Sequence, residues 1–234
     1  MALYKNYSKK EKKKRYLRDG IIMLVLLLLA ITTLFPIYYM IISSFGEPVE
    51  AGAASYSILL RNPTLNSYKF FFDYSKYSYR WIMNSFIVAG VVTVTNVLFA
   101  TTAGYAFAKL RFAGNKVIFF IILVAMMIPY QVTQVPLYIL VVNVLKVKDT
   151  YFALVAPSLV TAYNIFLAKQ FIGSLPSEII EAAKIEGCSQ PKLLVKIIMP
   201  LSKTVMAVMA ITTFMGSWNT FFWPFLVTSE EKMQ

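Results

Sequence analysis

Long apolar runs alternate with short charged segments along the chain. Windows of about 20 residues that are nearly free of charge predict membrane-spanning segments. Five such segments are predicted, at residues 21–45, 82–108, 117–140, 151–171 and 205–227. Each is predicted to be a helix, because backbone groups in lipid need partners within their own segment and these runs exceed the strands of a barrel. The pattern therefore predicts an all-α, polytopic bundle of transmembrane helices.

The charged segments predict how the chain is divided and oriented. We expect a basic N-terminal segment at 1–20, the first transmembrane helix at 21–45, an extracytoplasmic loop at 46–81 and a core domain at 82–234 with a loop at 174–200. With the N-terminus inside, 16 Lys and Arg residues fall in cytosolic segments and 7 in outer ones, which favours a cytosolic N-terminus. A secretory signal is the alternative for the first run, but that run is about twice the length of a signal's hydrophobic region.

Composition excludes several kinds of chemistry. The chain has no histidine and one cysteine, Cys188, so it offers no nitrogen or sulfur metal site and no internal disulfide. It contains no phosphate-binding loop, so it is not expected to bind and hydrolyse ATP by itself. We predict no catalytic residue and no bound cofactor, and we do not expect the chain to be an enzyme. The net charge of +12 lies mostly in segments beside the membrane, where topology and anionic lipid explain it better than nucleic acid.

The acidic residues count against a proton-driven carrier. All eleven lie outside the predicted spans or at their edges. Proton-coupled carriers usually keep ionisable side chains within the membrane as relays. A membrane subunit without its own energy source is therefore favoured, and an ion-coupled secondary transporter stays as the alternative.

The loop at 174–200 predicts two short helices. In "SEIIEAAKIEG", Ser177 is a predicted N-cap and Glu178 lies in the favourable first turn. Gly187 can adopt the left-handed conformation that ends the helix, and Ser189 with Pro191 begins the next one. The exposed face of the first helix either fits a cleft of another protein or rests on lipid headgroups. The residues alone leave both readings open.

The stretch "EAAKIEGCSQPKLLVKIIMP" at 181–200 resembles the cytosolic EAA loop of the membrane subunits of binding-protein-dependent ABC importers. Met199 stands where that family has leucine, which conserves volume. In the family this loop docks on the ATPase subunit. The resemblance thus implies coupling residues here, and these are Ile179, Glu181, Ala182, Ala183, Glu186, Gly187, Ile197 and Pro200.

Further stretches resemble the carbohydrate-uptake branch, and specifically the shorter permease subunit of maltose and multiple-sugar systems. They include "FPIYYMIISSF", "AGYAFAKLRFAGN", "MIPYQVTQVPLYIL" and "SWNTFFWP". The resemblance implies the type I permease fold in a bacterial cytoplasmic membrane. It implies a homologous permease subunit, two ATPase subunits that bind ATP and magnesium, an extracellular solute-binding protein and a sugar substrate as partners. It also leads us to expect a sixth span after 205–227, before which this sequence ends; a truncated remnant is thus another alternative.

Candidate residues for the substrate path follow from sugar chemistry. Sugars are bound by aromatic faces and by amide and hydroxyl groups. The candidates near predicted span ends or kinks are Tyr130, Gln131, Asn164, Trp218 and Asn219. The alternative for the aromatic residues is anchoring at the membrane interface, and Pro129 and Pro136 either mark a gate or only kink a helix.

Overall fold

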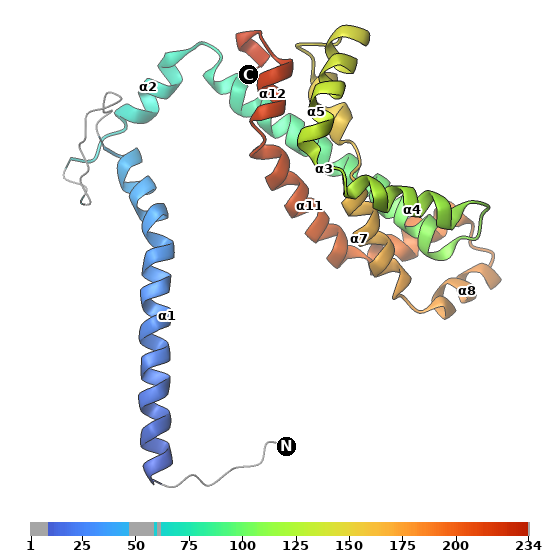
Figure 1. Ribbon diagram of the computed structural model, residues 1–234, viewed down its shortest axis with the longest axis horizontal. Coiled ribbons are helices and arrows are strands. Elements are labelled where there is room, and N and C mark those ends of the chain that lie inside the picture. The colour runs from blue at the N-terminus through green and yellow to red at the C-terminus, as the bar shows by residue number, and fades with distance from the viewer. Residues whose placement is uncertain (1–8, 47–58, 60–61, 234) are drawn as a thin grey trace. The chain divides into compact units, whose positions relative to one another are not determined.

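The computed structural model describes residues 9–46, 59 and 62–233, and every regular element among them is helical (Figure 1). The all-α prediction is confirmed for these residues. The chain divides into two compact units, at residues 1–78 and 79–234. Two helices, Lys13–Ser44 and Ser78–Lys109, are long and apolar enough to cross a membrane alone. The number rises to five if each of three bent helix pairs is counted as one span.

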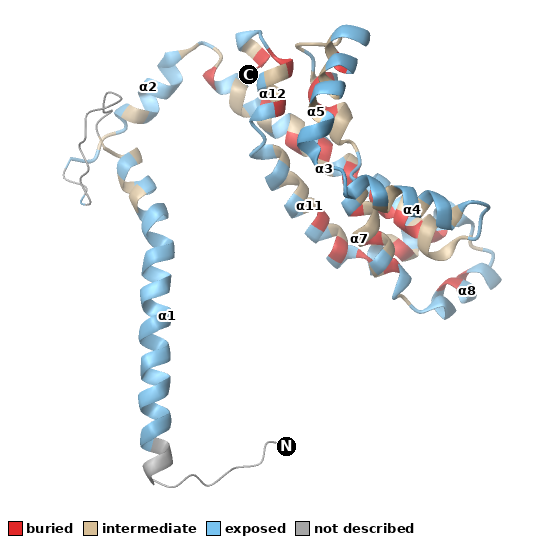
Figure 2. Ribbon diagram, in the orientation of Figure 1, coloured by how far each residue is buried: buried red, intermediate tan, exposed pale blue. Residues whose placement is uncertain are grey.

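The first unit contains α1 (Lys9–Ser44) and α2 (Asn66–Tyr74). The apolar window of α1 has no buried residue, and Figure 2 shows the helix exposed along almost its whole described length. A surface of leucine and isoleucine without protein cover is what a lipid-facing helix requires. The helix α2 lies inside the segment for which only a loop is predicted.

The second unit is built on α3 (Ser78–Lys109), whose first residue belongs to the first unit. The other elements are α4 (Asn115–Met126), α5 (Tyr130–Tyr138), η1 (Ile139–Val144), α6 (Tyr151–Val155), η2 (Ala156–Ser158), α7 (Ala162–Gly173), α8 (Ser177–Ile185), α9 (Gln190–Leu193), η3 (Leu194–Ile198), α10 (Met199–Leu201), α11 (Lys203–Trp218), α12 (Phe222–Val227) and η4 (Glu231–Met233). α7 packs between α4 and α11, while α12 packs against α5 and α6.

The predicted third span, 117–140, is not one straight helix. α4 and the α5–η1 helix meet at a bend of 96°. Pro129 lies at this break with φ −58° and ψ 132°. Proline has no N–H to continue the helix, and it disfavours helical geometry at the residue before it. Pro129 therefore ends one helix and begins another, whereas Pro136 is accommodated inside α5.

The predicted fourth and fifth spans are also broken. The fourth bends by 43° between η2 and α7. The fifth, predicted at 205–227, is interrupted where α11 ends at Trp218, before α12 begins at Phe222. A second bend, of 79°, lies between α10 and α11. Just before it the chain forms the π-helix η3, and Pro200 has no N–H to donate to the carbonyl four residues earlier. Apolar runs thus set the positions of the spans but not their straightness.

α3 and α7 cross with almost no space between them. A Cβ built on Gly104 would lie 2.6 Å from the Cβ of Ala168 and 2.8 Å from the backbone nitrogen of Lys169. Ala168 is completely buried, and its neighbours Ile172, Leu193 and Met209 belong to the same hydrophobic cluster. Small residues allow this close approach of helix backbones, which drives packing in membranes.

The segment after α12 is fastened to the loop before α6. Asp149 accepts hydrogen bonds from the N–H groups of Ser229 and Glu230, and its own N–H donates to Val227 O at 3.0 Å. Desolvation acts to raise the pKa of Asp149, but these N–H groups, with Lys148 and Lys232 nearby, outweigh it and lower the pKa. The carboxylate therefore stays charged and holds the turn.

Candidate functional site

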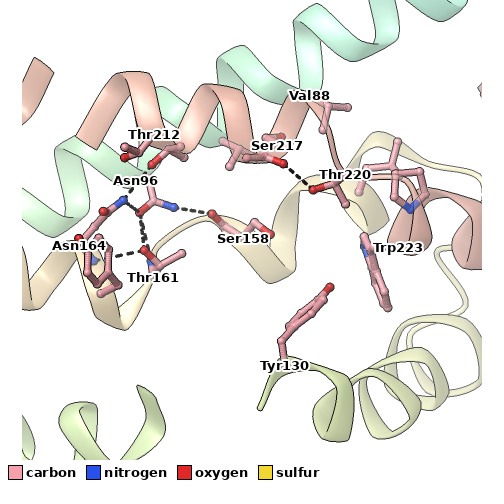
Figure 3. Close-up of a pocket in the computed structure, with 16 residues that line it drawn as sticks. Val88, Asn96, Tyr130, Ser158, Thr161, Asn164, Thr212, Ser217, Thr220 and Trp223 are labelled. Carbon is pink, nitrogen blue, oxygen red and sulfur yellow. Dashed lines mark hydrogen bonds between the residues drawn. The ribbon is translucent and has the colours of Figure 1, made fainter. Parts of the chain in front are cut away.

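A cavity of about 380 Å³ opens where the helices of the second unit are broken (Figure 3). Its wall combines α3, the start of α5, the α6–α7 break, the end of α11 and α12. The lining residues are Val88, Val92, Asn96, Tyr130, Leu154, Ser158, Thr161, Tyr163, Asn164, Thr212, Thr213, Gly216, Ser217, Thr220, Trp223 and Pro224. Irregular backbone is tolerated at membrane depth where it lines a cavity. The wall thus offers hydroxyl, amide and aromatic groups, and none of these lining residues carries a charge.

Asn96 organises the polar side of this cavity (Figure 3). Its Oδ1 accepts hydrogen bonds from Thr161 N (3.1 Å), Thr161 Oγ1 (3.2 Å) and Asn164 Nδ2 (2.8 Å). Its Nδ2 donates to Ser158 O at 2.7 Å. A carbonyl and an N–H left free by the break before α7 are both satisfied by one buried side chain, as burial of backbone groups demands. Asn96 therefore holds the broken fourth span against α3.

Two of the predicted path residues line the cavity. Asn164 is 3% exposed, and its Nδ2 also donates to Thr213 Oγ1 of α11 at 2.9 Å. Tyr130, at the first position of α5, presents its ring and hydroxyl to the opening. Gln131 follows it directly but is not part of the lining. The start of α5 and the network of Asn96 thus meet at one cavity.

Trp218 and Asn219 do not line the cavity. Trp218 packs on Phe86 and Phe214 at ring-centroid distances of 4.7 and 5.9 Å. Asn219 lies at the end of α11, where its N–H and Nδ2 both donate to Met215 O. An asparagine that satisfies the last carbonyl of a helix has a local structural role. Their neighbours Gly216, Ser217 and Thr220 line the cavity instead, while the side chains of Trp218 and Asn219 make these local contacts.

The residues that sequence reasoning missed have a recognisable signal. Asn96 lies within a 32-residue apolar helix and is fully buried. Polar side chains within membrane segments face the bundle interior and are costly unless paired, so an asparagine at this position marks a contact or a site. Trp223, whose Nε1 donates to Ala153 O at 3.0 Å, is 3% exposed and lines the cavity from α12.

The loop at 174–200 forms the expected pair of helices with a sharp corner. Gly187 has φ +78°, the left-handed conformation, and Cys188 N–H donates to Ala183 O at 2.9 Å to close the end of α8. The second helix begins as predicted, since Ser189 is the residue before α9 and Pro191 lies in its first turn. Ser177 is not the N-cap, because it is the first residue of α8 and Pro176 precedes it. Proline is tolerated before a helix, since its missing N–H would have no acceptor within the helix at that position.

One face of α8 packs against the core of the chain itself. Ile180 and Ala183 are 5% and 7% exposed and belong to the same cluster as Ile172 and Leu193. Ala183 is therefore not on a surface that another protein can contact, which corrects its expected place in a cleft. The exposed residues of α8 and its end are Ser177, Glu178, Ile179, Glu181, Ala182, Lys184, Ile185 and Glu186.

The remaining coupling candidates lie in the second helix of the loop. Ile197 is partly buried against the core cluster, and Pro200 is exposed just before the bend to α11. Tyr105 of α3 fixes the other end of this helix, since its hydroxyl donates to Gln190 Oε1 at 2.6 Å. No group of three His, Cys, Asp or Glu side chains that might hold a metal ion occurs among the described residues.

The fold and the cavity define a polytopic helical membrane protein with broken spans around a polar, uncharged chamber. The chain belongs to the family of binding-protein-dependent transport system inner membrane components, whose pattern matches residues 96–234. The all-α permease fold predicted from the sequence is thereby confirmed, as is the membrane class of the protein.

Two relatives and one solved structure illustrate the similarity. The arabinooligosaccharides transport system permease protein AraQ of Halalkalibacterium halodurans is 30% identical over 207 residues, or 88% of this chain and 74% of the relative. The sn-glycerol-3-phosphate transport system permease protein UgpE of Yersinia pestis is 34% identical over 65% of this chain and 54% of the relative. A crystal structure of a bacterial ABC transporter involved in alginate import matches 98% of this chain and 79% of its own, with a TM-score of 0.81 and 25% identity.

Proposed function

We propose that this protein is the permease subunit of an ATP-driven importer of a neutral oligosaccharide. It contributes its part of the translocation path beside a homologous permease subunit. Two ATPase subunits bind the ATP and magnesium, and an extracellular solute-binding protein delivers the sugar. The chain crosses the bacterial cytoplasmic membrane several times with its N-terminus in the cytosol. The observation that carries the proposal is an uncharged cavity of hydroxyl, amide and aromatic groups in a chain of this family.

The lining of the cavity favours a neutral solute over an anionic one. The relatives include systems named for arabinooligosaccharides and for sn-glycerol-3-phosphate. Bringing a phosphate or carboxylate out of water requires a cation or several aligned donors. The sixteen lining residues include no Lys and no Arg. Sugar hydroxyls, in contrast, pair well with Thr, Ser and Asn side chains, while sugar ring faces pack on Tyr and Trp.

Replacing Tyr130 tests the cavity as the substrate path. We expect Tyr130→Ala to lower the initial rate of ATP-dependent oligosaccharide uptake several-fold, because the variant removes an aromatic face at the opening. Uptake is measured in proteoliposomes that contain the complete transporter, with arabinooligosaccharides and sn-glycerol-3-phosphate as alternative solutes. The control is Gln131→Ala, because Gln131 follows Tyr130 on α5 without lining the cavity. Equal rates for the two variants, or uptake of only the phosphorylated solute, would contradict the proposed path.

The geometry of α8 supports a coupling role for the loop. Its buried side packs into the core with α3, α7 and α9, and Lys109 Nζ donates to Leu175 O at 2.7 Å just before the helix. The opposite side is exposed, with Ile185 at 88%, and Ile179 at its edge is 40% exposed. A helix fixed to the core on one side and held by a partner on the other moves both together, so closure of the ATPase subunits would be transmitted to the broken spans.

Cysteine crosslinking tests this coupling, with positions on the exposed face of α8 as the test and a position on its buried face as the control. In a Cys188→Ser background, which has no other cysteine, we expect Ala182→Cys and Ile185→Cys to crosslink to the ATPase subunit, with a yield that changes when ATP is added. Ala183→Cys should crosslink poorly, because Ala183 is 7% exposed and packed in the core. Efficient crosslinks at Ala183 alone, or none at the two exposed positions in intact membranes, would exclude α8 as the contact.

A further inference from the structure

The short helix α2 carries a broad aromatic face that is exposed among the described residues of its unit, although Tyr68 on that face contacts Phe45. None of its nine residues is buried. Its aromatic residues are Tyr68, Phe70, Phe71, Phe72 and Tyr74. Apart from Ser67, its polar residues are Asn66, Lys69 and Asp73, whose spacing by three and four positions places them in one narrow stripe of the helix. α2 is therefore amphipathic, with the aromatic side wider than the polar side.

Hydrogen bonds attach the beginning of α2 to the end of α1. Ser67 Oγ donates to Gly46 O at 3.0 Å, and Tyr68 OH donates to Ser44 Oγ at 2.9 Å. Thr64 N–H donates to Phe45 O at 2.8 Å. Since α1 ends at Ser44, α2 begins where the transmembrane helix leaves the membrane.

The side of α2 that faces the end of α1 is the aromatic side. Successive residues of a helix are rotated by about 100°. Ser67 and Tyr68, which bond to the end of α1, therefore flank the direction of Phe71. Lys69 and Asp73 are each two residues from Phe71, so they lie about 160° away from it. The aromatic face is thus turned toward the membrane end of α1, and the polar stripe is turned away.

The connection to the next span keeps α2 near the membrane surface along its whole length. Only Ser75, Lys76 and Tyr77 separate it from Ser78, the first residue of α3. A connection this short spans at most about 14 Å. In addition, Ser78 Oγ donates to Phe71 O at 2.8 Å. Neither end of α2 can move far from the end of a membrane-spanning helix.

We propose that α2 is an interfacial helix that lies flat in the lipid surface at the C-terminal end of α1. Phe70, Phe71 and Phe72 occupy the boundary between headgroups and acyl chains, while Lys69 and Asp73 remain in water. Lipid is the occupant because the aromatic face continues the uncovered apolar surface of α1, whose apolar window has no buried residue. Aromatic side chains favour this boundary, and amphipathic helices bury such faces about 5–10 Å deep in it. The proposal depends on the membrane location of the family and is independent of the substrate.

Site-directed spin labelling tests this position. Cys188→Ser removes the only cysteine, and single labels are then placed at Phe70→Cys, Phe71→Cys and Phe72→Cys on the aromatic side. Lys69→Cys and Asp73→Cys are the controls on the polar side. In lipid nanodiscs, we expect the ratio of accessibility to oxygen over accessibility to a water-soluble nickel chelate to be several-fold higher at the three aromatic positions than at the two controls.

Three results would overturn the proposal. High nickel accessibility at all five positions would mean that α2 lies in water. Shielding of the aromatic positions from both reagents would mean that protein covers them. Loss of oxygen accessibility only after addition of the solute-binding protein would make that protein the occupant of the face. Because three aromatic positions are labelled separately, a variant that fails to elute with the unlabelled protein on size exclusion is left out without loss of the test.

Discussion

Gly104→Ala is expected to destabilise the protein by about 3 kcal/mol or more, the upper end of the usual cost of overpacking. The added Cβ would lie 2.6 Å from Ala168 Cβ, 2.8 Å from Lys169 N and 2.9 Å from Ala168 C. Two of these atoms are backbone, so no change of side-chain rotamer relieves the contact. α3 and α7 would have to separate, and the cluster that also supports α8 through Ile180 would open with them.

Unfolding in mixed detergent micelles measures this effect, and the same helix provides the control. Gly90 also lies in α3, but a Cβ on it meets nothing within 4 Å. Alanine is favoured over glycine in a helix by about 1 kcal/mol. Gly90→Ala should therefore leave the unfolding midpoint unchanged or raise it, whereas Gly104→Ala should lower it. Equal midpoints for both variants would show that α3 and α7 do not cross at Gly104.

Asn96→Ala is expected to cost about 2 kcal/mol and to lower solute uptake. Single polar contacts between membrane helices are worth about 0.6 kcal/mol on average, but Asn96 makes four hydrogen bonds, which sum to about 2 kcal/mol. The variant leaves the Thr161 N–H and the Ser158 carbonyl at the helix break without this partner. The break before α7 should then loosen, and the cavity wall that Asn164 helps to form should lose its fixed shape.

Thr95→Val is the matched control for Asn96→Ala. Thr95 neighbours Asn96 on α3, but its hydroxyl donates only to carbonyls of its own helix, Val91 O at 2.8 Å and Val92 O at 3.1 Å. The control should unfold and transport like the unchanged protein. A combined Asn96→Ala, Asn164→Ala variant should lose less than the sum of the single losses, because the two side chains share one hydrogen bond. Strict additivity would show that this bond contributes nothing.

Much of the structure of the loop at 174–200 could be predicted from local sequence. The corner at Gly187 and the start of the second helix at Ser189 and Pro191 follow from backbone preferences that depend on neighbouring residues alone. The burial of Ala183 could not be predicted in this way. Ile179, Ala182 and Ala183 lie within four positions of one another, and only the presence of Ile172 and Leu193 beside α8 decides which of them is covered.

The residues that line the cavity could be predicted only in part, because tertiary contacts decide which side chains reach it. Tyr130 and Asn164 are of residue types that bind sugars, and both line it, but Trp218 is of such a type too and packs on Phe86 and Phe214 instead. Two signals in α3 were available and were not used. One is the buried Asn96 in an apolar helix. The other is the spacing of Ala100, Gly104 and Ala108 by four residues, which is typical of a close helix crossing.

The sequence by itself determined that the chain is an all-α membrane protein, where its apolar spans lie and which family it belongs to. These properties follow from the length of apolar runs and from local motifs, since lipid forces every spanning backbone to satisfy its own hydrogen bonds. Only the tertiary structure decided where those spans break, which face of α8 is covered and which polar groups share one cavity. Such features depend on contacts between residues far apart in the chain, such as Asn96 with Thr161 and Gly104 with Ala168, and no local pattern specifies a contact of that kind.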